Sequence, residues 1–552
     1  MNKRILVSAV VLLALPGLGL AQSISPAAAA SPADGARSTV TDAATRCAST
    51  AGLHVDASAI ELPTRGADVE STTLTAADPK SGYPEFCLVR GRVTSFDTTA
   101  PDINFQLNLP TSWNGKSVQF GGGGFNGIVI SGLGVVPEYV NESAAQGEPP
   151  LKRGYVTFGS DGGVAVGTNP AGSFALNKEA LANYAGQSVK RTRDAVMGIV
   201  ARYYGRQHVQ QYYAGGSKGG HEALVAAQRY GEDYDGIIAY FPANQNQALV
   251  LSWYHMWQQA YSHTGGYLDT AKQQLVHNAV YGACDKLDGA ADGVISDVQG
   301  CDRAFSVESL RCPDGIDSGD NCLSQQQIQT LNSATSPYKF SFPLANGVTE
   351  IGPYPALRGA DLGGAWLDGA GKGTASGYYG FVDPVIRYFI EQNPNGSLEN
   401  FDYRRYEARV KALSRLYDAT DPDIDRFARR GGKLIIVQGT EDMLVPQAAT
   451  DAYYDRLAER YGPSVRRFVR YYVQPGYGHA TGRFDLAWDS LTALEKWTDR
   501  QTPPADPVAT DANPSTEGRT RPLCEYPLWP RYKGHGDVDR AKNFTCAGRG
   551  RQ

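Results

Sequence analysis

The sequence predicts an α/β fold, with a parallel β-sheet core that is interrupted by a large inserted lid domain. Three segments indicate this class. A glycine-rich turn around Ser217 joins a β-prone segment to a helical one. An apolar run at 432–439 suits a buried parallel strand and leads into Asp442. A third strand-like run, 466–473, ends in a glycine-rich loop that carries His479.

Length and composition agree with a folded, soluble protein. The 552 residues correspond to three or four units of about 150 residues each. An apolar content of 42% argues against a disordered chain. With 52 basic and 57 acidic residues the net charge is −5, so there is no basic excess to neutralise phosphates. Nucleic acid is therefore not expected as a partner.

The segment 1–21 has the layout of a secretory signal. A basic start is followed by the apolar run 5–20 and by a small-residue cleavage site that ends at Ala21. The run contains Pro16 and is shorter than the about 20 residues that a membrane span needs. We expect export to the periplasm or the medium, with 22–40 as a flexible lead-in rich in Ala, Ser and Pro.

Export also affects the expected chemical state of the eight cysteines. In an oxidising compartment an even number of cysteines favours disulfides. A zinc site is disfavoured because the chain has no CxxC motif. Spacing alone does not determine the connectivity, and pairing between sequence neighbours is the simplest hypothesis.

The segment Gly215–Gly219 reads G-x-S-x-G between the segment 206–214, which ends in a β-prone stretch, and a helical segment, 221–230. This is the pattern of the nucleophile elbow of α/β-hydrolases. A strained strand-to-helix turn exposes the Ser217 hydroxyl, and the flanking glycines let neighbouring backbones pass. The Lys218 N–H then lies at a helix N-terminus and is a candidate oxyanion donor. The alternative is a glycine-rich turn with an incidental serine.

In α/β-hydrolases the acid and then the histidine follow the serine along the chain. Asp442 stands just beyond its strand, where open α/β sheets place their sites. Glu441 is its local rival, and capping the next helix is an alternative role for Asp442. Of the two histidines that follow, His479 and His535, only His479 sits on a loop directly after a strand. We predict His479 as the general base for Ser217, oriented by Asp442.

A glycine run, 121–124, follows the strand-like segment 117–120. Such a run supplies the second donor of an oxyanion hole, here the backbone N–H near Gly123. A phosphate-binding P-loop is excluded because no GK[ST] follows the glycines.

The two halves of the core are separated by a stretch too long for a loop and of domain size. We expect a first core part at 41–245, a lid domain at 246–429 and a second core part at 430–552. The lid should supply the substrate pocket. Six of its aromatic residues could stack on a phenyl acyl group, although most are expected in the core: Trp253, Trp257, Trp366, Tyr378, Tyr379 and Phe381.

Within the lid, Asp285, Asp288 and Asp292 are spaced by glycine turns. Three carboxylates in one short segment suit a hard cation, which prefers oxygen ligands. The EF-hand spacing is not matched, so that module is rejected. A solvated acidic turn is the alternative.

These motifs, together with the tail segments 521–527 (RPLCEYP) and 543–546 (NFTC), make the chain resemble the tannase/feruloyl esterase family from about 47 to 546. That family includes mono(2-hydroxyethyl) terephthalate hydrolase-like enzymes. The resemblance implies an α/β-hydrolase core with a large lid and hydrolysis of esters of aromatic carboxylic acids. The implied partner is a small aromatic ester, free or attached to a plant polymer or polyphenol.

The resemblance also implies a bound ion and a disulfide pattern. The family places a structural calcium in its lid, which here implies the carboxylates of Asp285, Asp288 and Asp292 and the backbone carbonyls of Ala290 and Val294 as ligands. The family's bridges support neighbour pairing: Cys47–Cys87, Cys284–Cys301, Cys312–Cys322 and Cys524–Cys546.

The chain departs from the family at Gly216 and Ala480. The family usually has a cysteine directly before the nucleophile and another directly after the histidine, joined as a disulfide. Neither sulfur attacks the ester, so the chemistry does not require the bridge. We expect an active enzyme in which packing and hydrogen bonds alone align Ser217 with His479.

Several functions fit this sequence. A secreted serine esterase that forms an acyl-enzyme is the preferred interpretation. A peptidase or an acyltransferase on the same scaffold is the second, because a fold does not determine its substrate. A non-catalytic binding protein is disfavoured by the intact Ser217, Asp442 and His479. A haloalkane dehalogenase is excluded because serine stands where aspartate would attack.

Overall fold

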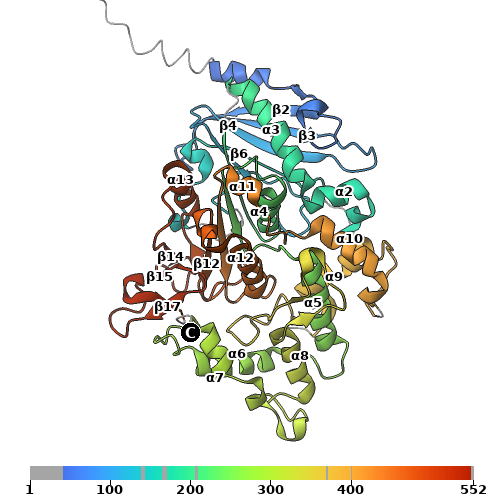
Figure 1. Ribbon diagram of the computed structural model, residues 1–552, viewed down its shortest axis with the longest axis vertical. Helices are drawn as coiled ribbons and strands as arrows, with labels where there is room; N and C mark the ends of the chain where they lie inside the picture. The colour runs from blue at the N-terminus through green and yellow to red at the C-terminus, as the bar shows by residue number, and fades with distance from the viewer. Residues whose placement is uncertain are drawn as a thin grey trace, which may run out of the picture.

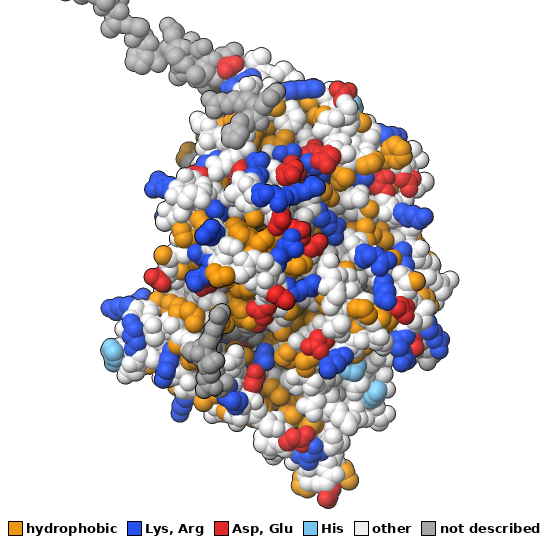
Figure 2. Space-filling model, viewed as in Figure 1, with side chains coloured by type: hydrophobic (Ala, Val, Ile, Leu, Met, Phe, Trp, Pro, Cys, Tyr) orange, Lys and Arg blue, Asp and Glu red, His pale blue; other side chains and the backbone are white. Residues whose placement is uncertain are grey.

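The structure is a computed structural model that describes residues 42–137, 143–164, 171–205, 209–368, 371–399 and 401–548. The expected secretory signal and the lead-in after it lie outside these described residues. On the face shown in Figure 2, basic and acidic side chains are interspersed. Within the described ranges, no helix combines the length and the apolar character that crossing a bilayer would need.

An eleven-stranded sheet forms the centre of the core (Figure 1). Its six central strands, in the order β6-β5-β7-β8-β11-β12, pair in parallel, and the outer strands pair antiparallel. In chain order its strands are β1 (His54–Val55), β2 (Ala67–Thr75), β3 (Phe86–Val93), β4 (Ile103–Pro110), β5 (Lys116–Phe120), β6 (Val156–Ser160), β7 (Gln210–Gly216), β8 (Gly236–Tyr240), β11 (Lys433–Gly439), β12 (Val469–Gln474) and β16 (Cys524–Glu525).

Helices cover both faces of the parallel strands, as a buried parallel sheet requires. Every residue of β8 and β11 is buried. Leu494 and Trp497 pack in the apolar cluster on one face, and Leu224 and Leu457 pack in the cluster on the other. The helices of the core are α2 (Lys178–Ala182), α3 (Ser188–Tyr204), α4 (Lys218–Arg229), α12 (Gln447–Tyr461) and α13 (Ser490–Arg500).

Between β8 and β11 the chain leaves the sheet and builds a second helical body, at the lower end of Figure 1. Its elements fall within the predicted lid range, and its apolar cluster around Trp253, Trp366 and Tyr378 continues into core residues such as Tyr184 and Met443. Its elements are α5 (Asn246–Tyr261), α6 (Thr270–Cys284), α7 (Val298–Ala304), α8 (Gln325–Thr335), β9 (Tyr338–Lys339), β10 (Glu350–Ile351), α9 (Gly377–Pro384) and α10 (Glu407–Tyr417). The following helix, α11 (Asp425–Arg429), also falls within the predicted lid range but packs against α4 of the core, with Phe427 in the same apolar cluster as Leu224.

The C-terminal segment adds small strands that lie beside the lid helices α6 and α7 (Figure 1). Three of them form an antiparallel sheet, β13 (Leu486–Ala487), β14 (Val508–Asp511) and β15 (Thr520–Pro522). The other two, β17 (Trp529–Tyr532) and β18 (Phe544–Ala547), form a hairpin. These strands therefore connect the second part of the core to the lid.

Candidate active site

Ser217 stands at a strained turn between β7 and α4. Its backbone has φ 59° and ψ −118°, a conformation that costs free energy in a residue other than glycine. The turn is possible because glycines surround it: a Cβ on Gly215 would lie 2.5 Å from a backbone carbon of Gly219. The strain exposes the hydroxyl beyond the carboxyl end of β7, as the elbow motif predicts.

The loops after β11 and β12 bring an acid and an imidazole to this hydroxyl. His479 Nε2 lies 2.9 Å from Ser217 Oγ, and His479 Nδ1 lies 2.8 Å from Asp442 Oδ2. Because a carboxylate accepts hydrogen bonds, Nδ1 carries the proton and Nε2 is free to accept the serine proton. The three residues predicted as a catalytic group are therefore joined in one hydrogen-bonded chain.

Asp442 is held in place by its own backbone. The residue is fully buried, and its Oδ1 accepts hydrogen bonds from the N–H groups of Leu444 and Val445, each at 2.8 Å. The alternative role as a helix cap is wrong, because the N-cap of α12 is Pro446. One carboxylate oxygen is bound by the loop and the other faces His479, so the carboxylate can hold one orientation of the imidazole.

Two backbone segments offer donors for an oxyanion. Lys218 is the first residue of α4, so its N–H has no acceptor within the helix. The glycine loop 121–124 packs against the same helix, where a Cβ on Gly121 would lie 2.6 Å from Gly219 Cα. The Gly122 N–H is already bound to Glu222, whereas a Cβ on Gly123 would meet open space. A Cβ on Gly124 would meet open space as well, so the loop borders an open volume at both Gly123 and Gly124.

Comparison with known proteins agrees with this geometry. Residues 87–547 match the family model described as tannase and feruloyl esterase. The chain belongs to the tannase and feruloyl esterase family. An uncharacterized esterase of Agrobacterium fabrum is 36% identical over 532 residues, covering 92% of this chain and 94% of that protein. The mono(2-hydroxyethyl) terephthalate hydrolase of Piscinibacter sakaiensis is 29% identical and covers 87% of each chain.

Solved structures of other proteins have the same fold as this chain. An esterase from Aspergillus oryzae superimposes with a TM-score of 0.74 at 22% identity, covering 91% of this chain and 99% of that chain. Feruloyl esterase B from the same organism gives a TM-score of 0.72, with the same identity and coverage. The predicted α/β-hydrolase fold is confirmed, and the protein is a carboxylic ester hydrolase.

An aromatic ring stands where the family's extra disulfide would be. A Cβ on Gly216 would lie 2.8 Å from the Phe241 ring, and the same ring packs on His479 with a centroid distance of 4.7 Å. Phe241 is buried and follows β8 directly. The ring therefore contacts both the serine loop and the histidine loop, and the sequence did not indicate this side chain.

A cavity of about 830 Å³ opens beside His479. Core residues Met443 and Leu444 line one side, and lid residues such as Gln274 and His277 line another. The volume is within the range of small-molecule sites, roughly 300–1,000 Å³. Of the six aromatic candidates, Trp253, Trp366 and Tyr378 are buried in the apolar cluster of the lid, and Trp257, Tyr379 and Phe381 are partly buried and pack against it, in agreement with the expectation that most of them are structural.

Glu441, the rival acid, faces this cavity and not the imidazole. Its carboxyl accepts a hydrogen bond from Tyr281 of α6 at 3.1 Å. Burial raises the pKa of Glu441 to about 8, so the group is mostly protonated at neutral pH. It therefore joins the acid loop to the lid without competing for His479.

All eight cysteines are paired in the structure, in the neighbour pattern that the resemblance implied. The bridges are Cys47–Cys87, Cys284–Cys301, Cys312–Cys322 and Cys524–Cys546. Two of them lie within the lid, one ties the N-terminal segment to β3, and one joins β16 to β18. Each closes a local loop, so none substitutes for the missing bridge between the serine and histidine loops.

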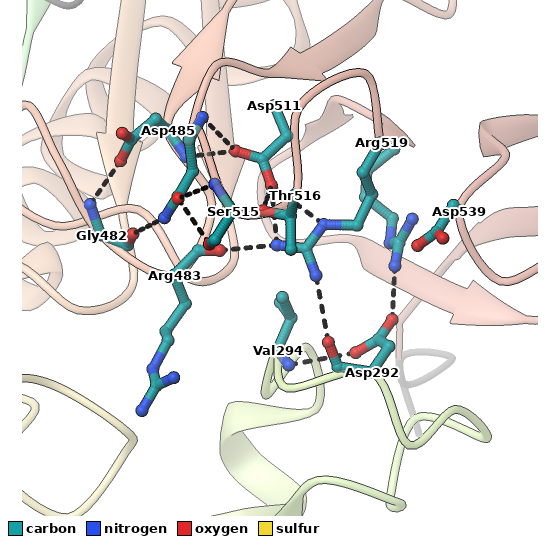
Figure 3. A network of polar contacts seen from close by, with 12 residues as sticks. Asp292, Val294, Gly482, Arg483, Asp485, Asp511, Ser515, Thr516, Arg519 and Asp539 are labelled. Carbon is teal, nitrogen blue, oxygen red and sulfur yellow. Dashed lines mark hydrogen bonds and ion pairs between the residues drawn. The ribbon is translucent and has the colours of Figure 1, made fainter.

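The acidic lid loop has suitable oxygen ligands for calcium but does not gather them. Each of Asp285, Asp288 and Asp292 accepts a hydrogen bond from a backbone N–H of its own loop. Asp292 also pairs with Arg521 at 2.5 Å, and its carbonyl accepts from Arg519, which reaches toward it in Figure 3. Among the described residues, no three His, Cys, Asp or Glu side chains are grouped so that they could hold a metal ion.

Proposed function

We propose that this carboxylic ester hydrolase is an exported serine esterase that cleaves esters of aromatic carboxylic acids through an acyl-enzyme. The observation that carries the proposal is the continuous hydrogen-bonded chain from Asp442 through His479 to Ser217. The aromatic acyl group is supported by the names of relatives, which include a mono(2-hydroxyethyl) terephthalate hydrolase and a probable feruloyl esterase of Arthroderma benhamiae.

The geometry supports a two-stage reaction. Ser217 Oγ attacks the ester carbonyl carbon while its proton moves to His479 Nε2. The negative charge that develops on the carbonyl oxygen would be held by the N–H groups of Lys218 and Gly123. When the tetrahedral species collapses, the carbon–oxygen bond to the alcohol breaks and His479 returns the proton to that alcohol. Water then attacks the acyl carbon while it gives a proton to His479. The bond between that carbon and Ser217 Oγ breaks, His479 returns the proton to Oγ, and the acid is released.

Asp442 stabilises the imidazolium that forms twice in each cycle. Its carboxylate lies 2.8 Å from Nδ1, and it is fully buried, so the attraction acts through little water. The residue does not need to take up a proton for this role.

A panel of substrates tests the proposal. Methyl ferulate, methyl gallate, chlorogenate and a peptide amide are assayed with wild-type protein, with Ser217→Ala, and with Ser188→Ala as a control at a buried serine in α3. We expect turnover of at least one aromatic ester, fluorophosphonate labelling at Ser217, and loss of both in Ser217→Ala, with the rate falling by about 10³-fold or more.

The other outcomes identify the competing functions. Faster cleavage of the amide would indicate a peptidase, and preferred transfer of the acyl group to an added alcohol would indicate an acyltransferase. Absence of both turnover and labelling in wild-type protein would indicate a binding protein that kept the fold.

We propose further that the protein is exported and that its lid binds a structural calcium ion. Export is supported by the signal-like first 21 residues and by four disulfides, which form in oxidising compartments. For calcium, Asp285, Asp288 and Asp292 with the carbonyls of Ala290 and Val294 would be the ligands, and the carboxylates would have to turn from their present partners to gather round the ion. The ion would stabilise the lid loop and take no part in the reaction.

A further inference from the structure

Directly beneath the serine turn lies a buried ion pair that the reaction as described does not use. Lys218 and Glu222 are 2% and 4% exposed, and Lys218 Nζ donates to Glu222 Oε1 at 2.6 Å. The two residues are one turn apart on α4. Burying an ion pair brings little net stability, because removing both charges from water costs about as much as their attraction returns. A role other than stability therefore has to be sought.

The Glu222 carboxylate is saturated by donors from three different elements. Its Oε2 accepts from the Gly122 N–H and the Tyr213 hydroxyl, each at 3.0 Å. Its Oε1 accepts from Lys218 Nζ and from the Asn126 side-chain amide at 2.9 Å. Two of these donors, Gly122 and Asn126, belong to the loop that contains Gly123. The carboxylate thus joins that loop to the helix whose first N–H belongs to Lys218.

At this junction the two proposed donors of the oxyanion hole, the N–H groups of Lys218 and Gly123, must be held in a fixed position relative to each other. Residues 121–124 of this loop are all glycines and have no side chains of their own to anchor them; a Cβ on Gly122 would lie 2.2 Å from Asn126 Oδ1. One further tie is the Tyr184 hydroxyl, which donates to the Gly124 carbonyl at 3.0 Å. Backbone donors contribute to catalysis only when they are fixed before the charge develops.

We propose that Glu222 is a positioning residue that fixes the glycine loop against α4, so that the N–H groups of Gly123 and Lys218 converge on one oxyanion. This inference rests on the proposed serine mechanism. Glu222 acts through its hydrogen bond to the Gly122 N–H. The ammonium of Lys218 balances the buried negative charge, and two tyrosine rings face that ammonium, with centroids 4.8 Å (Tyr184) and 5.6 Å (Tyr417) from Nζ.

The neighbouring His221 is part of this charge balance and is not a base. It is fully buried, and its Nε2 donates to the Tyr417 carbonyl at 2.6 Å. Its Nδ1 is then unprotonated and accepts from Lys218 Nζ at 3.4 Å. Burial and the adjacent ammonium lower the pKa of His221 well below its usual value, so the ring stays neutral.

Two double variants separate the effect of the hydrogen bond between Gly122 and Glu222 from the effect of the buried charges of Lys218 and Glu222. In Lys218→Met/Glu222→Gln the buried pair is neutral, and the side-chain oxygen of the introduced glutamine can still accept from Gly122. In Lys218→Met/Glu222→Ala the pair is equally neutral, but the acceptor is lost. Both variants keep the backbone N–H of position 218. Asp194→Asn is the matched control, because Asp194 is another buried carboxylate with a lysine one turn earlier, Lys190, on α3.

We expect the Ala double variant to have a kcat about 10²-fold below that of the Gln double variant, as for loss of one oxyanion donor, with KM within about two-fold. Affinity for a trifluoromethyl ketone, which forms a tetrahedral adduct, should fall by the same factor as kcat/KM. Melting temperatures show whether each variant is folded, and Asp194→Asn should retain the wild-type kcat even where its melting temperature falls.

Equal kcat values for the two double variants would overturn the inference, because they would show that only charge balance or packing matters. A different result would reject the proposed function: a wild-type protein that neither hydrolyses esters nor is labelled at Ser217 by the fluorophosphonate. An active wild-type protein with an unaffected Ala double variant would reject the role of Glu222 alone.

Discussion

Glu441 and Asp442 are adjacent in the chain, yet their carboxyl groups serve different parts of the molecule. Asp442 Oδ2 lies 2.8 Å from His479 Nδ1, whereas Glu441 accepts a hydrogen bond from Tyr281 of the lid at 3.1 Å. The loop after β11 therefore orients the imidazole with one side chain and holds the lid with the next. Hydrogen bonds to different partners thus give the two adjacent acids separate roles.

Replacing Asp442 by asparagine should abolish most of the activity without unfolding the protein. Asparagine keeps an oxygen for the N–H groups of Leu444 and Val445 but places an NH₂ group against His479 Nδ1. The ring then carries its proton on Nε2 and cannot accept the proton of Ser217. We expect kcat to fall by about 10⁴-fold with little change in KM, measured on the preferred ester.

Two further variants complete that experiment. Asp302→Asn, at an exposed acid of the lid, should behave as wild type. A loss of this size in Glu441→Gln but not in Asp442→Asn would instead make Glu441 the acid that orients the histidine.

The pKa of Glu441 predicts a pH dependence of stability. Burial raises this pKa to about 8 from an ordinary value of 4.5, so the native state keeps a proton that the unfolded chain releases between these values. The free energy of unfolding should therefore fall as pH rises from 4.5 to 8, with a slope of up to about 1.4 kcal/mol per pH unit from this group. Urea unfolding at pH 5 and pH 8 measures the effect.

Glu441→Gln should lose less stability than wild type between pH 5 and pH 8. Some dependence should remain, because burial also raises the pKa of Asp418 and of Asp451 to about 7. Glu407→Gln, at a half-exposed carboxyl, is the control and should follow the wild-type curve. An identical pH dependence in wild type and Glu441→Gln would mean that Glu441 is ionised in the native state.

The sequence was sufficient for the fold class and for the three residues of the hydrogen-bonded chain. Ser217, Asp442 and His479 each follow a strand, and parallel strands bring their carboxyl ends to one edge, so local patterns predicted a long-range meeting. The roles of Glu222 and Phe241 were not predicted. A charged residue on a helix is usually solvated, and an aromatic after a strand is usually core. Their roles depend on contacts across the fold, which local patterns do not reveal.

The Phe241 ring should determine whether the family's extra disulfide can be restored. Gly216→Cys places a Cβ 2.8 Å from that ring, so Gly216→Cys/Ala480→Cys should oxidise incompletely. Adding Phe241→Ala removes the obstacle, and the triple variant should form the bridge and melt at a higher temperature than its reduced form. Mass spectrometry of thiol-alkylated protein counts the free cysteines.

Two results would contradict this account of Phe241. Complete oxidation of the double variant, with a gain in melting temperature, would show that the ring yields easily and does not align the loops. Failure of the triple variant to form any bridge would show that positions 216 and 480 do not approach each other in solution.

Removal of calcium tests the proposed ion in the lid. If Asp285, Asp288 and Asp292 gather round calcium, saturating calcium adds binding free energy to the native state, about 2.7 kcal/mol at one hundred times Kd. Chelation should then lower the melting temperature by a few degrees, and added calcium should restore it better than magnesium, which requires a stricter geometry. Asp288→Asn should melt lower and no longer respond to chelator, whereas Asp320→Asn, at an exposed lid acid, should respond as wild type does. A wild-type melting temperature that is unchanged by chelation would show that backbone N–H groups and Arg521 are enough to hold this loop.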